Sequence, residues 1–307
     1  MSAETATARV RTLDGLTIVP RRYPWRWITG AVLLLLTGLV VRDALTNRNF
    51  GWGVVWQYIR DVSIMRGLGV TIMLTVICMV AGIVLGILIA AMRLSGNPVA
   101  QVVAYLYTSF FRGTPVLVQL LFWFNLAALY PVISFGIPGV HLSANALISP
   151  MTAAILGLSL NEAAYMSEII RGGVLSVDHG QTEAASALGM SHARTLRRVV
   201  FPQAMRVIVP PTGNEAITML KTTSMVSVLA VPDLLYSSQV IYAQNFQTIP
   251  LLIVACIWYL VATAILSVGQ YYLERRFARG GRRSLPPTPL QRVRAALAAH
   301  RSVEVHG

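Results

Sequence analysis

The chain has 307 residues, of which 55% are hydrophobic and only 12% charged, and its formal net charge is +13. Soluble domains carry roughly 25% charged residues, so this composition excludes an ordinary soluble protein and indicates a membrane protein. The excess of arginine also suits nucleic-acid binding, but the arginines lie outside the apolar runs, as positive-inside topology produces. We therefore expect the chain to lie in a lipid bilayer and not to bind nucleic acid.

The N-terminal segment predicts one membrane anchor. Residues 1–26 are polar and rich in arginine, and the apolar run "WITGAVLLLLTGLVV" follows at 27–41. A cleaved secretory signal is the competing interpretation, but the run lacks a convincing small-residue cleavage site. We expect an additional N-terminal transmembrane helix at 27–41, with residues 1–26 in the cytoplasm.

The remaining chain predicts five more spans. Runs at 67–92 and 249–272 contain no charged residue and exceed the roughly 20 residues that cross a bilayer. Further spans are expected at about 99–130, 149–170 and 207–235, each interrupted by proline or polar residues. The result is an all-α integral membrane protein with about six transmembrane helices and both termini cytoplasmic. Residues 278–307 form a basic cytoplasmic tail.

The sequence suggests a packing role for the two cysteines and a structural or gating role for three prolines. Cys78 and Cys256 lie within apolar runs and are expected to pack as small apolar residues, with no disulfide or metal site. Pro115 and the pair Pro210 and Pro211 interrupt spans, so that freed backbone groups need partners. Each proline is either a gating point or a static kink.

Ionisable residues inside the expected spans are candidates for a substrate path, because charge at membrane depth is costly. They are Glu162, Glu168, Glu215 and Lys221. The alternative is that they form internal ion pairs or hold helices together. Asn161, Glu162 and Tyr165 fall within one helical turn and are predicted to share a face with Glu168.

Arg112 and Lys221 are assigned to gating or structure. Arg112 precedes Pro115 and is expected to anchor the cytoplasmic edge of a span. Lys221 is the only lysine, and it follows Leu220 rather than the glycine that a phosphate-binding loop requires. The chain is therefore not expected to hydrolyse ATP itself.

A polar stretch at 178–202 predicts two short helices. Asp178 can cap the first helix, with Gln181 completing a capping box, and this helix is expected to reach Gly189. Ser191 can cap a second helix that leads to Pro202. The first helix has a small, weakly apolar face, typical of close docking, that is made by Glu183, Ala184, Ala187 and Leu188.

The same stretch resembles the EAA signature of ATP-binding-cassette importer permeases. The matching residues are Glu183, Ala184, Ala185, Gly189, Val199, Phe201 and Pro202. The family prefers isoleucine and leucine at the positions of Val199 and Phe201. The resemblance makes 178–202 a coupling helix that contacts an ATPase through Glu183, Ala184, Ala185, Ala187, Leu188, Gly189 and Pro202.

Four further segments look like the polar-amino-acid permease family: "GLGVTIMLTV", "FFRGTPVLVQL", "LSLNEAAYMSEIIRGG" and "PPTGNEAITMLKTTSMVSVLAVPDLL". The resemblance covers about 64–277 and implies a MetI-like permease core in a bacterial plasma (inner) membrane. It implies as partners a cytoplasmic ATPase dimer carrying ATP and Mg²⁺, a second permease, identical or homologous, and an extracytoplasmic solute-binding protein. No cofactor is expected in this chain.

The expected function is the permease subunit of an importer for polar or charged amino acids or related small solutes. Related permeases often carry a small hydroxyl residue at the position of Glu162, so we hypothesise that this carboxylate meets a substrate ammonium. Two alternatives remain: a gradient-driven secondary transporter that uses the intramembrane carboxylates, and a membrane scaffold.

Overall fold

The structure, a computed structural model, describes residues 24–133 and 142–278. It divides into two units at Phe50, and each is described by itself. The first unit contains helix α1 (Pro24–Thr46) and a short 3₁₀ turn, η1 (Arg48–Phe50). Nearly all the side chains described on α1 are exposed, although Ile28–Thr46 is long and apolar enough to cross a membrane. The helix extends beyond the run expected at 27–41.

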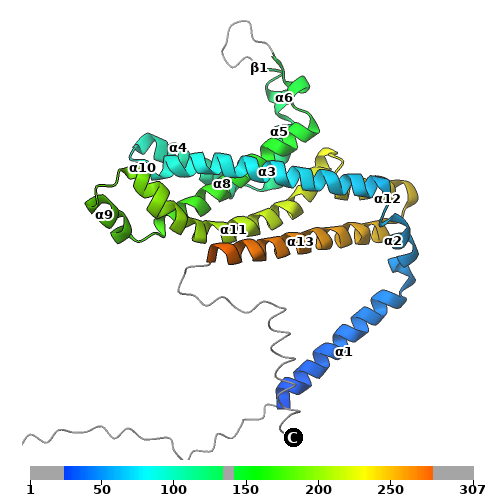
Figure 1. The fold of residues 1–307 in the computed structure, drawn as a ribbon. Coiled ribbons are helices and arrows are strands. Elements are labelled where there is room, and N and C mark those ends of the chain that lie inside the picture. The colour runs from blue at the N-terminus through cyan, green and yellow to red at the C-terminus, as the bar shows by residue number, and fades with distance from the viewer. Residues whose placement is uncertain (1–23, 134–141, 279–307) are drawn as a thin grey trace, which may run out of the picture. The chain divides into compact units, whose positions relative to one another are not determined.

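The second unit is almost wholly helical (Figure 1). Its long helices are α3 (Val62–Leu94), α4 (Pro98–Gly113), α8 (Pro150–Leu175), α11 (Phe201–Thr222), α12 (Leu234–Asn245) and α13 (Thr248–Ala278). Its shorter helices are α2 (Trp52–Tyr58), α5 (Val116–Phe124), α6 (Leu126–Leu129), α7 (Ala144–Leu147), α9 (His179–Ala187), α10 (His192–Thr195), the π-helical η2 (Leu196–Val200) and the 3₁₀ helix η3 (Thr223–Leu229).

One small sheet interrupts the helical pattern. Strand β1 (Val132–Ile133) pairs antiparallel with β2 (Leu142–Ser143), with Val132 opposite Ser143. The sequence analysis did not predict these strands. They join the α5–α6 segment to α7 and α8 and leave the expected helical fold class unchanged.

Helix α3 makes the most extensive helix–helix contact of the bundle, because it packs along α8 over much of its length (Figure 1). Asp61 caps it by accepting a hydrogen bond from the Ser63 amide at 2.8 Å. Two glycines permit the close approach: a Cβ at Gly82 would lie 2.5 Å from Glu162 Cγ, and one at Gly86 would lie 2.7 Å from Met166 Cβ. Small residues at a helix contact are the usual way in which membrane helices approach closely.

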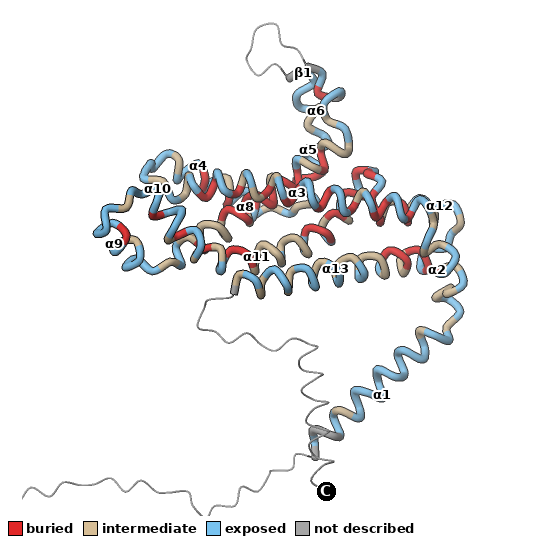
Figure 2. The backbone as a smooth tube through the Cα atoms, in the orientation of Figure 1, coloured by how far each residue is buried: buried red, intermediate tan, exposed pale blue. Residues whose placement is uncertain are grey.

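The core lies between α3, α5, α8 and α11. Figure 2 shows buried residues on the sides of these helices that face one another and exposed residues on their outer sides. Leu74, Leu120 and Leu158 are almost completely buried in it. Cys78 is buried there as expected, whereas Cys256 on α13 is exposed and does not pack in the core.

The expected break at Pro115 is present. Helix α4 ends at Gly113, and Pro115 in extended conformation caps α5. The freed backbone groups find side chains: Gln119 donates to the carbonyl oxygens of Phe111 and Thr114, at 3.0 and 3.1 Å. Asn161 also donates to the Phe111 carbonyl, at 2.8 Å.

The expected break at Pro210 and Pro211 is wrong, because both prolines lie inside α11. The interruption comes later, where η3 ends in the left-handed residue Ala230 and α12 begins after Asp233. Thr223 and Ser224 donate to the carbonyl oxygens of Leu220 and Lys221, and such hydroxyl bonds compete with the regular helical ladder. The segments on either side are bent by 45°.

By length and composition, three described helices can cross a membrane, or four if the bent pair is one span. They are α1, α3, α13 and the pair 192–229 with 234–245. Helix α8 has 26 residues, about 39 Å at 1.5 Å per residue, but carries polar residues where it is surrounded by other helices. Four of the six predicted spans therefore fall on these elements, whereas the spans predicted at 149–170 and 99–130 fall on α8 and on α4 and α5 and stay predictions.

Candidate functional site

The segment joining α8 to α11 lies at one end of the bundle, far from α2 and α12 (Figure 1). Its first helix, α9, starts after Asp178, whose side chain accepts from the Gly180 amide at 2.7 Å. This contact replaces the expected capping box with Gln181. Gly189 follows the helix with φ of +72°, and the Met190 amide donates back to the Ala185 carbonyl at 3.1 Å. The predicted helix and its glycine turn are therefore present.

The residues of α9 that are predicted to contact an ATPase differ in their exposure. Glu183, Ala184 and Ala187 are exposed, and Leu188 is 82% exposed. Ala185 is only 4% exposed, so it packs against its own chain rather than toward a partner. A single exposed leucine is common on protein surfaces, so the exposure of Leu188 makes it available to a partner without by itself marking an interface.

The second part of this segment continues directly into the membrane bundle. The sequence analysis placed a helix end at Pro202, but α10, η2 and α11 follow one another without a break, with Pro202 in the first turn of α11. Because the helix is continuous, Pro202 has no free helix N-terminus, and it closely follows the π-helical turn η2, where the regular hydrogen-bond ladder is already interrupted. Ser191 precedes α10 without a side-chain capping bond. Beyond the turn at Gly189, continuous helix therefore joins α10 to α11.

A second candidate site runs from the buried residue Glu162 to the exposed residue Arg112. We call Arg112, Glu162, Tyr165 and Glu215 the polar cluster; they come from α4, α8 and α11. The Arg112 guanidinium lies 5.3 Å from the centre of the Tyr165 ring. Glu215 is within electrostatic range of both Arg112 and Glu162. Glu215 therefore lies between a second carboxylate, Glu162, and the guanidinium of Arg112 in its electrostatic interactions.

Glu162 is the most unusual member of the polar cluster. It is 4% exposed, it packs against Gly82, and within the part of the chain that the structure describes its Oε1 atom has no hydrogen-bond partner. A buried carboxylate without a partner is costly, so such a group usually has a functional reason.

The other predicted path residues are already engaged. Asn161 donates to Phe111 and, at 3.1 Å, to Gln119 Oε1, so it holds the α4–α5 break against α8. Glu168 accepts from Arg171 at 2.7 Å and pairs with Arg93 at 3.5 Å. The polar residues predicted to share a face of α8 therefore differ: Asn161 and Glu168 have partners within the structure, whereas the Oε1 atom of Glu162 has none among the described residues.

Two buried polar residues were not singled out from the sequence. Gln119 is a single polar residue in an apolar helix, a signal that would have identified it. Asp233 is fully buried and caps α12, accepting from the Tyr236 amide at 2.8 Å and from the Tyr259 hydroxyl at 3.3 Å. An aspartate directly after Pro232 is a common helix-start signal.

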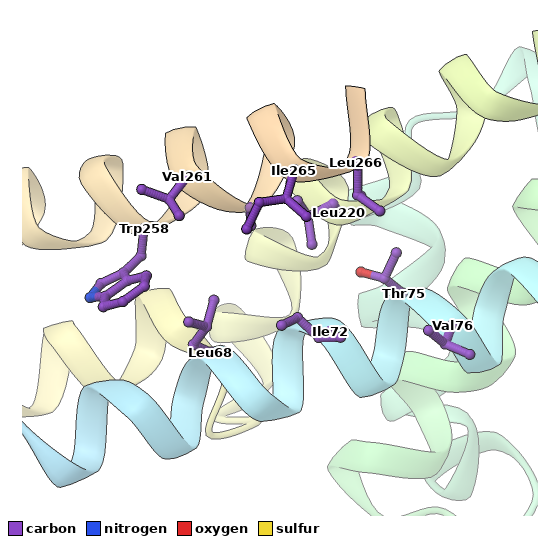
Figure 3. Close-up of a pocket in the computed structure, with 10 residues that line it drawn as sticks. Leu68, Ile72, Thr75, Val76, Leu220, Trp258, Val261, Ile265 and Leu266 are labelled. Carbon is purple, nitrogen blue, oxygen red and sulfur yellow. The ribbon is translucent and has the colours of Figure 1, made fainter. Parts of the chain in front are cut away.

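An apolar groove between α3 and α13 is a different kind of site (Figure 3). It has a volume of about 240 Å³, and Leu68, Ile72, Trp258 and Ile265 are among the residues that line it. Its lining contains no ionisable side chain, so it offers no counter-charge to a charged solute.

No group of three or more histidine, cysteine, aspartate or glutamate side chains suited to a metal ion occurs in the ranges 24–133 and 142–278. Lys221 is an exposed residue in the last turn of α11.

Comparison with known proteins identifies related chains. The arginine transport system permease protein ArgU of Corynebacterium glutamicum is 48% identical over 268 residues, which cover 87% of this chain and 84% of that protein. The glutamine transport system permease protein GlnP of Escherichia coli is 36% identical, over 74% of this chain and 97% of that protein.

Solved structures agree with these relatives. A crystal structure of an amino acid ABC transporter with histidines has 36% identity and a TM-score of 0.61, covering 74% of this chain and 98% of that one. The MetNI methionine ABC transporter, at 17% identity and a TM-score of 0.57, shares the fold. Residues 82–279 match the family model described as the binding-protein-dependent transport system inner membrane component. The chain therefore belongs to that family of ABC importer permeases.

Proposed function

We propose that this permease carries basic amino acids, with arginine as the leading substrate, and that the polar cluster holds the positive charge of the substrate. Family membership makes the chain the membrane component of an amino-acid ABC importer and not its ATPase. It also decides against a gradient-driven carrier or a scaffold. The substrate proposal is supported by the 48% identity to an arginine permease.

The observation that carries the proposal is the buried, unpaired carboxylate of Glu162. Its neighbour Glu215 has the same charge, and Arg112 acts electrostatically on Glu215. A cation entering this cluster would gain a counter-charge and a hydrogen-bond acceptor that the described residues leave unused. Every amino acid supplies one such cation in its α-ammonium group, and a basic side chain supplies a second, so the preference for basic substrates rests on the identity to the arginine permease.

The same proposal assigns coupling to α9. Glu183, Ala184, Ala187 and Leu188 contact a cytoplasmic ATPase dimer, which holds ATP and Mg²⁺, and Gly189 makes the turn between the two arms. Closure of the ATPase moves α9, and the continuous helix from α10 through η2 transmits this movement to α11. Ala185 supports the loop from inside, because it is buried.

The assembly around the chain follows from the family in general terms, and its composition is part of the proposal. It comprises this permease in the inner membrane, a second permease, identical or homologous, the ATPase dimer and an extracytoplasmic solute-binding protein. Both termini of the chain lie in the cytoplasm, on the same side as α9. Uptake then starts at the outer end, where α2 and α12 lie, and finishes at the α9 end.

The proposal is tested by uptake into proteoliposomes that contain this chain with its ATPase, second permease and binding protein. Radiolabelled L-arginine, L-lysine, L-glutamine and L-glutamate are compared with ATP inside and without ATP. We expect ATP-dependent uptake of arginine that excess lysine inhibits and excess glutamate does not. Preferential uptake of glutamine or glutamate would overturn the substrate, and uptake without ATP would overturn the coupling.

A further inference from the structure

Lys221 lies near the middle of the membrane-spanning bundle. The preceding residue, Leu220, is 1% exposed and faces the apolar groove (Figure 3). The same groove is lined by Thr75 and Ile265, which lie near the middle of α3 and α13. The backbone of Lys221 is therefore held at a depth where a charged side chain is costly in lipid.

The face of α11 that carries Lys221 is polar. Asn214 and Thr218 precede it by seven and three residues, spacings that keep all three on one side of a helix, and all three are exposed. Met219 and Leu220 are buried on the other side. A polar, exposed face at this depth does not suit contact with lipid tails; it suits a water-filled path or another subunit.

Lys221 also lacks a counter-ion. Both ion pairs formed among residues 24–133 and 142–278 involve Glu168, and no described carboxylate lies within ion-pair distance of the Lys221 ammonium. Glu215 is on the same helix, but its electrostatic neighbours are Glu162 and Arg112. The ammonium group at this depth therefore calls for a carboxylate from outside the described chain.

We propose that Lys221 binds the α-carboxylate of the transported amino acid. This rests on the proposed function, in which the polar cluster holds the positive end of the substrate. Glu215 and Lys221 are six residues apart, which is about 9 Å along the axis and roughly 120° around it in a regular helix. That axial separation is comparable to the distance between the carboxylate and the guanidinium of extended arginine, and the rotation around the helix adds to the distance that the substrate and the two side chains have to bridge.

The same chemistry has a second source, a carboxylate of the second permease, and the experiment separates the two. The permease–ATPase complex is reconstituted in nanodiscs without the binding protein, and equilibrium binding of labelled L-arginine is measured. Agmatine, which is arginine without its carboxylate, and L-arginine methyl ester, in which the carboxylate is neutralised, serve as competitors. The variants are Lys221→Met, Lys221→Arg and, as a matched loss of one exposed charge on α3, Arg66→Met.

We expect the wild-type complex to bind L-arginine at least about tenfold more tightly than agmatine or the ester, a difference of about 1.4 kcal/mol. Lys221→Met should bind L-arginine as weakly as agmatine, with agmatine binding unchanged. Lys221→Arg should keep the preference, and Arg66→Met should behave as wild type. If Lys221→Met does not accumulate in the membrane, Lys221→Gln carries the same comparison.

Three results would overturn the inference. Preference for L-arginine over agmatine that survives in Lys221→Met would show that another group binds the carboxylate. Equal weakening of both ligands, together with loss of the second permease during purification, would assign the counter-charge to that subunit. If the wild-type complex neither binds nor takes up arginine, the proposed function itself fails, and the inference fails with it.

Discussion

Helix α8 carries two glutamates, six residues apart, in opposite environments. Glu168 lies toward the α9 end, where Arg93 and Arg171 neutralise it. Glu162 lies deeper, packed against Gly82, and its Oε1 atom has no partner among the described residues. The protein thus pairs the carboxylate that it uses for structure and leaves unpaired the one that we assign to substrate.

This comparison predicts the largest loss of transport at Glu162. Glu162→Gln keeps the shape and removes the charge, and a hydrogen bond to a charged group contributes about 1.5–3 kcal/mol, so ATP-driven arginine uptake at low concentration should fall at least about tenfold. The melting temperature should not fall, because no ion pair is lost. Reduced stability with normal uptake would place Glu162 with Glu168 among structural groups. Glu274→Gln on α13 is the matched control.

A smaller loss of uptake is expected when a neighbouring substitution displaces the Glu162 side chain without replacing it. In Gly82→Ala the new methyl group meets the side chain of Glu162, and in Gly86→Ala it meets Met166 Cβ at a similar distance. Both should destabilise the α3–α8 contact, by about 1–3 kcal/mol as overpacking does. Thermal unfolding should register both variants, whereas uptake per folded complex should fall several-fold more in Gly82→Ala. Equal loss of uptake would mean that helix spacing, and not the carboxylate, matters.

The next largest effect is expected from a substitution in the proposed ATPase contact, which should weaken coupling without changing substrate binding at the polar cluster. Leu188 is 82% exposed, so Leu188→Asp leaves the permease folded but places a charge in the proposed ATPase contact. A charge in an apolar contact should cost at least about 1 kcal/mol, so ATP-driven uptake should fall at least about fivefold. Equilibrium arginine binding in nanodiscs should stay unchanged. Full uptake in this variant would remove Leu188 from the interface.

The smallest effect on transport is expected at Glu168. Glu168→Gln leaves Arg93 and Arg171 without their carboxylate, and loss of a half-buried pair should lower stability by about 1 kcal/mol after allowance for solvent screening. The melting temperature should therefore drop while arginine uptake per folded complex changes less than about twofold. A large loss of uptake at unchanged stability would contradict the division of roles on α8.

Much of this architecture was predictable from local patterns. The apolar runs predicted α3 and α13, Pro115 marked the break between α4 and α5, and Asp178 with Gly189 marked both ends of α9. These signals act over a few residues, so that a single sequence contains them. The family assignment rested on the same kind of signal, the spacing from Glu183 to Pro202.

The rest depends on contacts between distant residues. Asn161 and Gln119 are 42 positions apart in the chain, and their hydrogen bond turns a predicted path residue into a structural one. The burial of Ala185 depends on how α9 folds back on its own loop. Pro210 and Pro211 looked like a break, but the helix bends only after η3, where hydroxyl groups and Asp233 supply the alternative hydrogen bonds.

The proposed role of Glu162, to hold the positive charge of the substrate, is tested by comparing two ligands at that residue. Binding of L-arginine and of L-citrulline, its neutral analogue of nearly the same shape, is measured on the nanodisc complex with glutamate or glutamine at position 162. The account predicts that wild type prefers arginine by at least about tenfold and that Glu162→Gln removes this preference by weakening arginine alone. A preference that is unchanged in Glu162→Gln would contradict the account.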